Sequence, residues 1–301
     1  MRGLAAVLAA FVSVCGQASP LELAVTIDDL PVHAPYPPGV TPDEVSRDMI
    51  AALNAAHAPA TGFVNAVRMQ DQPETDSVLG EWHSAGFTLG NHGWAHRHLS
   101  EMTVPEFEQE LVNDEPALRR HGAKTDWHWF RYPFLDEGKD ADQRAAARAA
   151  LKKHGYRVAA VTTGFSDWAW TPAYARCSEA GNAAAVTELE RMYLAAVRTS
   201  IADDRAAAHR LYGRDIPYVL LMHVSAMSAH MMPQVLQIYR EAGYRFVSLE
   251  KAERDPVYAS YTDLSLPAPK SRGELAKARG VVLPAPPDYS AKLDAICPSA
   301  N

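Results

Sequence analysis

Apolar and polar positions along the chain alternate between short strand-like runs and longer stretches with helical spacing. The short runs predict strands at 22–28, 60–66, 87–90, 127–132, 156–162, 218–223 and 245–249. The longer stretches predict helices at 41–56, 75–85, 104–120, 140–154 and 231–242. Strands that alternate with helices of this length indicate a parallel sheet or a β/α barrel.

Two segments depart from this alternation. Residues 183–213 predict a long helical insertion before the apolar strand at 218–223. The tail at 255–301 is rich in proline, so we expect it to wrap the surface as an extended segment. We therefore predict a single domain over 19–301, with a catalytic core at about 22–250.

The first 18 residues have the pattern of a cleavable secretory signal. A basic start at Arg2 precedes an apolar run at 4–14 that is too short for a permanent membrane anchor, and Ala18 marks the predicted cleavage site. An N-terminal helix of a cytosolic protein and a lipoprotein signal at Cys15 are the alternatives. No other stretch predicts a stable membrane span, so we expect a periplasmic or secreted protein.

Charge and cysteine content narrow the partners and the covalent options. A formal net charge of -7 without dense Lys/Arg clusters makes nucleic acids and anionic membranes poor partners. Cleavage at the predicted site leaves Cys177 and Cys297, which an exported chain can join in a disulfide. Two free thiols are equally compatible with the sequence, which also leaves the oligomeric state open.

Paired carboxylates follow the first predicted strand, at Asp28 and Asp29. Adjacent carboxylates repel each other unless a cation or different roles relieve the repulsion. One carboxylate that binds a metal ion and one that acts as a base would satisfy this requirement. The alternative is an Asx turn at the end of a strand.

A histidine pair follows the strand at 87–90. His92 and His96 would face the same side of a helix and bind one divalent ion together if the segment is helical. A structural histidine pair is the alternative, and His98 offers a second partner for His96. Both clusters lie where β/α barrels place their active sites, at the carboxyl ends of strands.

Two further clusters lie at later strand ends. Arg131 opens the sequence RYPF and can hold a carboxylate in a fixed geometry, although a surface arginine before a turn is the simpler interpretation. His223 ends the apolar strand, and Asp167 can orient it and raise its pKa, which suits a general acid. The alternatives are a structural histidine, a capping aspartate and a packed aromatic at Trp168.

The order and spacing of these clusters resemble the polysaccharide deacetylase family, also called the NodB-homology or carbohydrate esterase family 4 group. The resemblance covers about 22–250. The family's motifs are T-F-D-D, H-(S/T)-x-x-H, R-x-P-(Y/F), D-W and L-x-H. They correspond here to TIDD at 26–29, HGWAH at 92–96, RYPF at 131–134, DW at 167–168 and LMH at 221–223.

The resemblance implies a distorted (β/α)7 barrel and a metal-dependent hydrolase. By this resemblance Asp29, His92 and His96 are the metal ligands, and two imidazoles with one carboxylate suit zinc best, with cobalt, nickel or manganese as alternatives. Asp28 is then the general base that activates the attacking water, and Arg131 keeps it ionised and oriented.

The same resemblance assigns the remaining roles. His223 is the acid that protonates the leaving amine, with Asp167 as its orienting partner. The backbone N–H of Phe134 donates to the oxyanion. Trp168, Leu221 and Tyr132 contact the substrate.

Three positions depart from the family pattern: Ile27 replaces phenylalanine, Gly93 stands where serine or threonine supports the second motif, and Gly164 stands where the fuller D-W motif carries an acid. The change at Gly93 removes a hydrogen bond that supports the metal ligands.

The expected reaction is removal of N-acetyl groups from a glycan that contains N-acetylhexosamine, such as peptidoglycan, a chitin-like polymer or an exopolysaccharide. Two alternatives remain open: hydrolysis of a small amide or imide on the same fold, and a non-catalytic glycan-binding envelope protein. Tryptophans near the motifs either stack on sugar rings or belong to the core. They are Trp94, Trp127, Trp129, Trp168 and Trp170.

Overall fold

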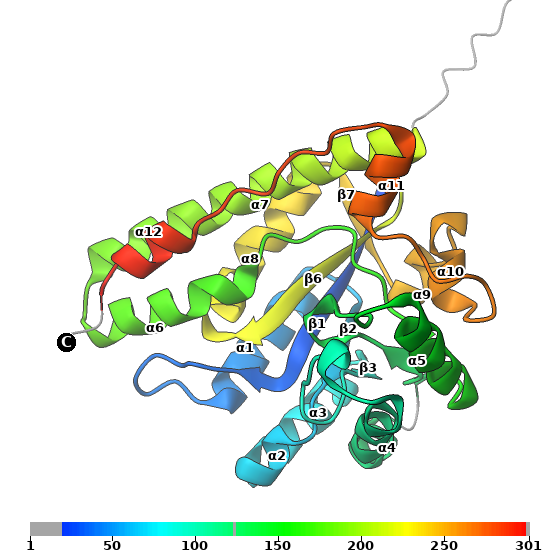
Figure 1. Cartoon of the computed structure of the whole chain (residues 1–301). Coiled ribbons are helices and arrows are strands. Elements are labelled where there is room, and N and C mark those ends of the chain that lie inside the picture. Colours follow the sequence, from blue (N-terminus) through cyan, green and yellow to red (C-terminus); the bar gives the residue numbers. More distant parts are fainter. Residues whose placement is uncertain (1–19, 123–124, 299–301) are drawn as a thin grey trace, which may run out of the picture.

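The protein folds around a curled parallel sheet, seen at the centre of the computed structural model in Figure 1. The structure describes residues 20–122 and 125–298. The strand order is β5-β4-β3-β2-β1-β6, and β7 also pairs with β1. The strands are β1 (Leu21–His33), β2 (Ala60–Val64), β3 (Thr88–Asn91), β4 (Trp129–Phe130), β5 (Arg157–Val158), β6 (Tyr218–Ser225) and β7 (Tyr244–Val247).

The chain after β5 brings the two ends of the strand order together. Thr163 forms a parallel bridge with Leu220 of β6. The N–H of Leu221 donates to the carbonyl of Thr163 at 3.1 Å. The sheet therefore curls into a distorted barrel, which confirms the fold class expected from the sequence.

Helices cover the outside of the sheet, and several begin as the sequence predicts. Thr41 and Thr103 each form a capping box at the start of a helix, with Glu44 and Glu106 as the reciprocal partners. The longer helices are α1 (Pro42–Ala55), α3 (Asp76–Ser84), α4 (Val104–His121), α5 (Ala141–Lys153), α6 (Thr171–Glu179), α7 (Ala183–Tyr212) and α8 (Ala226–Glu241). The shorter helices are α2 (Arg68–Asp71), α9 (Leu249–Ala252), α10 (Ala259–Thr262), α11 (Arg272–Arg279) and α12 (Ser290–Ala295).

Several element boundaries differ from the sequence prediction. β4 and β5 pair over two residues each. The apolar residues that flank them are buried but do not continue the strand ladder. β1 extends five residues past Asp28 to His33, whereas the prediction ended it at Asp28. α8 begins at Ala226 rather than Met231, because the Ser225 side chain caps it by accepting from the Ser228 N–H. Helix α6 was not predicted.

The insertion is one helix of 30 residues, α7, and the C-terminal segment runs beside it in Figure 1. The tail is extended in part, as expected, but α10, α11 and α12 interrupt it. A disulfide joins Cys177 of α6 to Cys297, with the two Cα atoms 5.2 Å apart. Arg176 adds hydrogen bonds to the carbonyls of Cys297 and Leu293, at 2.9 and 2.8 Å. The end of the described chain is therefore fixed to α6.

The predicted secretory signal at 1–18 lies outside the described residues. Within the described ranges, no helix combines the length and apolar character needed to cross a membrane.

Candidate active site

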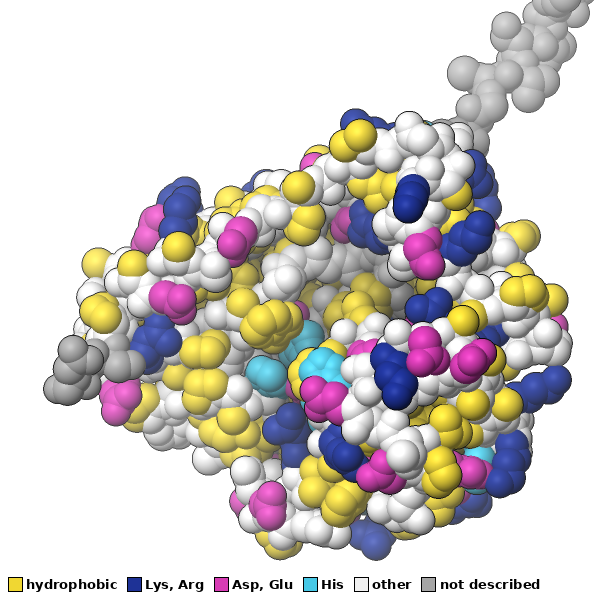
Figure 2. Space-filling model, in the orientation of Figure 1, with side chains coloured by type: hydrophobic (Ala, Val, Ile, Leu, Met, Phe, Trp, Pro, Cys, Tyr) yellow, Lys and Arg dark blue, Asp and Glu magenta, His cyan; other side chains and the backbone are white. Residues whose placement is uncertain are grey.

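A cavity of about 290 Å³ lies at the carboxyl ends of the strands and contains most of the predicted site residues. Histidine side chains gather near the centre of this face of the molecule in Figure 2. The cavity is lined by Asp28, Asp29, His33, His92, His96, Tyr132, Phe134, Leu135, Trp168, Leu221 and His223.

Asp29, His92 and His96 converge in this cavity. Each offers one possible ligand atom, and these atoms lie within 4.8 Å of one another. The Nε2 atoms of His92 and His96 lie 3.6 and 3.3 Å from Oδ1 of Asp29. In His92, Nδ1 lies 2.8 Å from the Arg131 carbonyl, so we assign the proton to Nδ1, which directs the Nε2 lone pair into the cavity.

The protonation of these three side chains fits a divalent cation. Burial lowers the pKa of both His92 and His96 to about 4, which keeps the imidazoles neutral. Burial raises the pKa of Asp29, but the hydrogen bond with His33 and the nearby histidines outweigh it and hold the pKa well below its usual range. Oδ1 of Asp29 is buried and has no hydrogen-bond partner among the described residues. A metal ion is the partner that this donor set fits.

The segment that carries the histidine pair is not helical. Residues 92–98 form a turn, and His96 has a left-handed backbone with φ of 52°. Gly93 is also left-handed, with φ of 72°, and a Cβ atom there would meet its nearest neighbour at an ordinary 3.5 Å. Glycine therefore serves the backbone conformation at this position rather than filling a tight space.

Buried polar groups from other elements hold this turn. The Asn65 amide donates to the carbonyls of His92 and Gly93, at 2.8 and 2.7 Å. Glu110 accepts from the Ala95 N–H at 2.6 Å, and Asp114 accepts from the Ala66 N–H at 2.7 Å. The Asn65 and Glu110 contacts support the possible metal ligands without the serine or threonine of the family motif, and Asp114 holds the neighbouring loop at Ala66.

Sequence reasoning missed Asn65, Glu110 and Asp114. Asn65 gave a usable signal, because it is a polar residue directly after the buried strand β2. The two acids of α4 looked like ordinary polar positions on an amphipathic helix.

Asp28 lines the cavity and faces Arg131, which lies behind it and does not line the cavity. Nη1 of Arg131 lies 3.5 Å from Oδ2 of Asp28, and both side chains are buried. The other guanidinium nitrogens donate to the carbonyls of Ala159 and Ala160 and to the Thr26 hydroxyl. Burial raises the pKa of Asp28 to about 6, and the positive charge of Arg131 opposes this rise. Arg131 is therefore an anchored cation beside the candidate base, not a surface arginine.

His223 and Asp167 also meet. Nδ1 of His223 lies 2.9 Å from Oδ1 of Asp167, and the His223 backbone N–H donates to Oδ2 at 2.8 Å. The Ser228 hydroxyl donates to the same Oδ2 at 2.6 Å, a contact that sequence reasoning missed. Burial lowers the pKa of His223, but Asp167, with smaller contributions from Asp29 and Asp28, outweighs it and raises the pKa to about 9. The imidazole is thus held protonated at neutral pH.

The register of the sheet places the candidate base and acid side by side. Asp28 of β1 pairs with His223 of β6. His92 Nε2 lies 3.5 Å from Oδ2 of Asp28, which connects this pair to the possible metal ligands. A reacting group in the cavity can therefore contact the candidate base, the candidate acid and the possible metal ligands.

The predicted substrate-contacting residues line the same cavity. Trp168 and Phe134 are each about half exposed, whereas Tyr132 is buried. Phe134 has a left-handed backbone, with φ of 57°, and its ring stacks on His98 at a centroid distance of 3.7 Å. His98 itself lies 3.3 Å from Asp136, so it is not part of the His92 and His96 group.

Most of the tryptophans near the motifs do not reach the cavity. Trp127, Trp129 and Trp170 are buried in the core, and Trp94 is partly buried against it. Trp168 differs from them, because it is exposed and lines the cavity.

His33 is a further cavity residue that sequence reasoning missed. Its Nδ1 lies 2.5 Å from Oδ2 of Asp29, and Nη2 of Arg68 lies 3.7 Å from the same oxygen. Asp29 has a left-handed backbone, with φ of 69°, so β1 changes direction there before it reaches His33. This contact fixes one carboxylate oxygen and leaves the other facing the histidines.

The sequence matches the family model named polysaccharide deacetylase over residues 16–159. This range contains the paired aspartates, the histidine pair and the RYPF motif.

The fold resembles several solved structures. A carbohydrate esterase family 4 pseudoenzyme from Bacillus anthracis matches with a TM-score of 0.55 and 14% identity, over 78% of this chain and 66% of the other. The peptidoglycan deacetylase PdaC from Bacillus subtilis matches with a TM-score of 0.52 and 20% identity, over 78% and 93%. A family 4 carbohydrate esterase from Streptomyces lividans, solved with acetate, matches with a TM-score of 0.50 and 17% identity, over 78% and 97%. At these identities the likeness concerns the fold.

Proposed function

We propose that this chain, which belongs to the polysaccharide deacetylase family, removes N-acetyl groups from an N-acetylhexosamine-containing glycan with the help of a divalent metal ion. One observation carries the proposal: a candidate proton acceptor and a candidate proton donor lie beside three possible metal ligands. Asp28 and His223 are paired in register, and Asp29, His92 and His96 open into the same cavity.

Asp29, His92 and His96 would hold the metal ion, and the donor set favours zinc. When bound, such an ion would polarise the substrate carbonyl and lower the pKa of the attacking water. The positions of the ligands depend on contacts within the chain: His33 on Asp29, and the Arg131 carbonyl on His92.

Asp28 and His223 divide the proton transfers. Asp28 accepts a proton from the attacking water as the new C–O bond forms. His223 then gives its proton to the sugar nitrogen as the amide C–N bond breaks, and the products are acetate and an amine. The raised pKa of His223, about 9, supports the role of acid, and Asp167 supplies the orientation. The Phe134 N–H is our candidate donor to the oxyanion.

The rim of the cavity supports a sugar substrate. Trp168 and Phe134 expose about half of their aromatic surface beside the catalytic groups. Such rings offer flat apolar faces against which sugar rings can pack. Peptidoglycan, chitin-like polymers and exopolysaccharides all carry N-acetylhexosamine, so each is a candidate glycan.

Export is part of the proposal. The disulfide between Cys177 and Cys297 supports an oxidising compartment, since such bonds are rare in the cytosol. The predicted signal at 1–18 points the same way. A periplasmic or secreted enzyme would also meet the glycans that lie outside the cytoplasm.

Acetate release from the purified mature protein tests the reaction. The protein is first stripped with a chelator and then reloaded with Zn²⁺ or Co²⁺. Chitin oligomers, peptidoglycan fragments and simple N-acetyl amides are assayed in parallel. We expect release from a glycan that depends on the added metal. Release from simple amides alone would favour the small-amide alternative. Bound metal without release from any substrate would favour a non-catalytic glycan-binding protein.

A further inference from the structure

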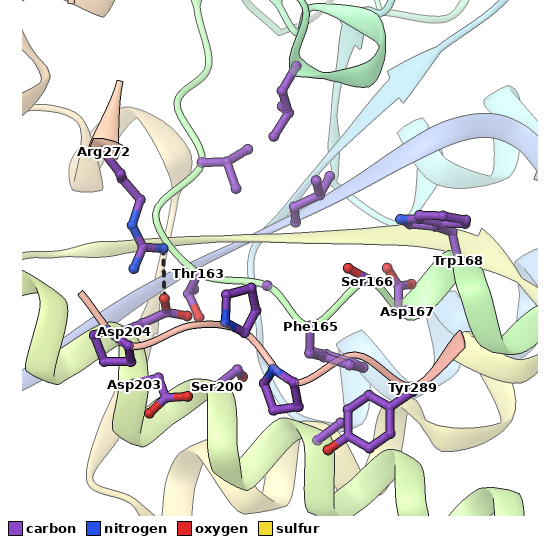
Figure 3. Close-up of a pocket in the computed structure, with 18 of the residues that line it drawn as sticks. Thr163, Phe165, Ser166, Asp167, Trp168, Ser200, Asp203, Asp204, Arg272 and Tyr289 are labelled. Carbon is purple, nitrogen blue, oxygen red and sulfur yellow. Dashed lines mark hydrogen bonds and ion pairs between the residues drawn. The ribbon is translucent and has the colours of Figure 1, made fainter. Parts of the chain in front are cut away.

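A second, larger cavity adjoins the catalytic one. Its volume is about 510 Å³, and Figure 3 shows its lining side chains. The two cavities share Leu135, Trp168, Leu221 and His223 on their walls. Both volumes are close to or within the roughly 300–1,000 Å³ usual for small-ligand pockets. A ligand that occupies the catalytic cavity therefore has room to continue past Trp168.

The wall of the second cavity combines apolar rings with polar groups. Phe165, Trp168 and Tyr289 contribute aromatic surface, and prolines of the C-terminal segment lie beside them. Ser200 and Asp203 contribute polar atoms from α7. Flat apolar surfaces and hydrogen-bonding groups in one cavity are the two features that a sugar ring needs, because its faces are apolar and its edges carry hydroxyls.

The charge of the cavity is unbalanced toward the acids. Asp167, Asp203 and Asp204 line it, and its cations are Arg272 and the protonated His223, which is paired with Asp167. Nη1 of Arg272 lies 2.8 Å from Oδ1 of Asp204, so this arginine is already paired. The remaining carboxylate at Asp203 disfavours a second anion in the cavity.

The far wall is built from elements outside the strand–helix repeat. Residues 283–289 of the C-terminal segment and the neighbouring α7 both contribute to it. The segment is held at one end by the disulfide at Cys297. At the other end Arg210 of α7 donates to the carbonyl of Val282, and Arg272 pairs with α7 through Asp204. The wall is thus attached on both sides of the cavity.

We propose that this second cavity is a binding subsite for the sugar residue next to the one being deacetylated, and that it accepts a neutral or amino sugar rather than an acidic one. This proposal rests on the function proposed above. It makes the substrate an oligosaccharide or chain segment of at least two sugars. The insertion α7 and the C-terminal segment are then the elements that determine specificity.

Cavity filling tests this subsite. The metal-loaded protein is assayed with N-acetylglucosamine and with its β-1,4-linked trisaccharide. We expect the wild type to have a kcat/KM for the trisaccharide at least about tenfold above that for the monosaccharide. Ser200→Trp places a large ring in the second cavity and is expected to lower this ratio by about tenfold. Ala202→Trp, at an exposed position of the same helix, is the matched control and should leave the ratio unchanged.

Asp203→Ala is a second variant that leaves the cavity open, so the test stands even if Ser200→Trp does not fold. It should lower the ratio by severalfold and should weaken the discrimination against a trisaccharide that carries a carboxylate on the neighbouring sugar. A wild type without preference for the trisaccharide would overturn the proposal. An unchanged ratio in the folded variants would also overturn it.

A binding measurement separates this subsite from the reaction. Titration calorimetry with the same trisaccharide on metal-loaded protein reports on the cavity without turnover. The subsite is supported if the wild type binds the trisaccharide, Ser200→Trp weakens this binding and Ala202→Trp does not. If no acetate is released in that case, only the proposed reaction fails. If the wild type releases acetate from the trisaccharide and both tryptophan variants release it equally well, the reaction is supported and the subsite is rejected.

Discussion

The two cavities share a wall but are built in different ways. The catalytic cavity takes its reacting groups from the ends of β1 and β6 and from the turns that follow β3 and β4, with Asp28 and His223 fixed by strand register. The second cavity takes its far wall from α7 and from residues 283–289, which no strand positions. In the proposed function, the barrel would position the reacting groups, and the added elements would determine which substrate reaches them.

The difference also appears in how each cavity is stabilised. Buried hydrogen bonds orient the catalytic groups, such as those of Arg131 to Ala159 and Ala160. The second cavity depends on a covalent bond at Cys297 and on a partly exposed ion pair at Arg272. Changes in the catalytic cavity should consequently affect the reaction rate, and changes in the second cavity should affect stability and substrate choice.

The largest effect on chemistry is expected for Asp28→Asn. Loss of the base should reduce kcat by about 10²–10⁴-fold, which is the usual contribution of general acid–base catalysis. The metal content should remain normal, because Asp29, His92 and His96 are untouched. Elemental analysis and acetate release on the same sample measure both quantities. His92→Ala is the contrasting variant and should lose metal and activity together. A near-normal rate in Asp28→Asn would rule out the assigned role.

Removal of the disulfide is the corresponding test of the second region. The bond closes a segment with a sequence separation of 120, so the double variant Cys177→Ser/Cys297→Ser should lose about 2–5 kcal/mol in the free energy of unfolding. The thermal midpoint, measured on the metal-loaded protein, should fall accordingly. Turnover of N-acetylglucosamine in the folded protein should stay within about twofold. This is well below the tenfold change that about 1.4 kcal/mol in the barrier would cause. A loss of monosaccharide turnover would show that the two regions are not separable.

The sequence predicted the arrangement of the catalytic cavity better than that of the second one. Alternating strands and helices predicted a parallel sheet or a β/α barrel, and the family resemblance implied the distorted barrel. The motifs converge because the carboxyl ends of parallel strands meet at one edge of the barrel. The sequence left the backbone of the histidine pair open, and a turn with left-handed residues at Gly93 and His96 brings the two imidazoles together without a helix.

What the sequence did not predict depends on contacts between distant segments. His33 reaches Asp29 only because the chain changes direction at a left-handed residue. The Asn65 amide reaches the His92 carbonyl across 27 positions. The wall at 283–289 depends on how the tail lies along α7, and no periodic pattern in a proline-rich segment encodes that position. The disulfide remained one of two possibilities, since spacing along the chain does not give a distance in space.

A smaller effect within the catalytic region is expected for Asn65→Ala. The change leaves the buried carbonyls of His92 and Gly93 without their amide donor and loosens the turn that carries the histidines. Contacts of this kind typically affect metal affinity by about 10–100-fold. Competition with a chelator gives the dissociation constant for zinc. Asn113→Ala, at an exposed position of α4, is the control and should keep the wild-type affinity. Equal affinities in the two variants would show that the turn does not need Asn65.

The smallest expected change is a shift in the pH profile for Asp167→Asn. In the proposed mechanism His223 is the acid, so its protonated form would be the active one, and its pKa of about 9 would place the loss of kcat/KM on the alkaline side. Asp167 raises this pKa against the effect of burial, and an opposite charge at such a distance contributes about 1–3 units. The variant should therefore lose activity at a lower pH than the wild type, while the acid limb, which we assign to Asp28, stays in place. Profiles of kcat/KM on the metal-loaded protein give both limbs, with Asp288→Asn in the exposed tail as the control. An alkaline limb that does not move would mean that His223 is not the acid, and the chemistry could then no longer be assigned to the paired ends of β1 and β6.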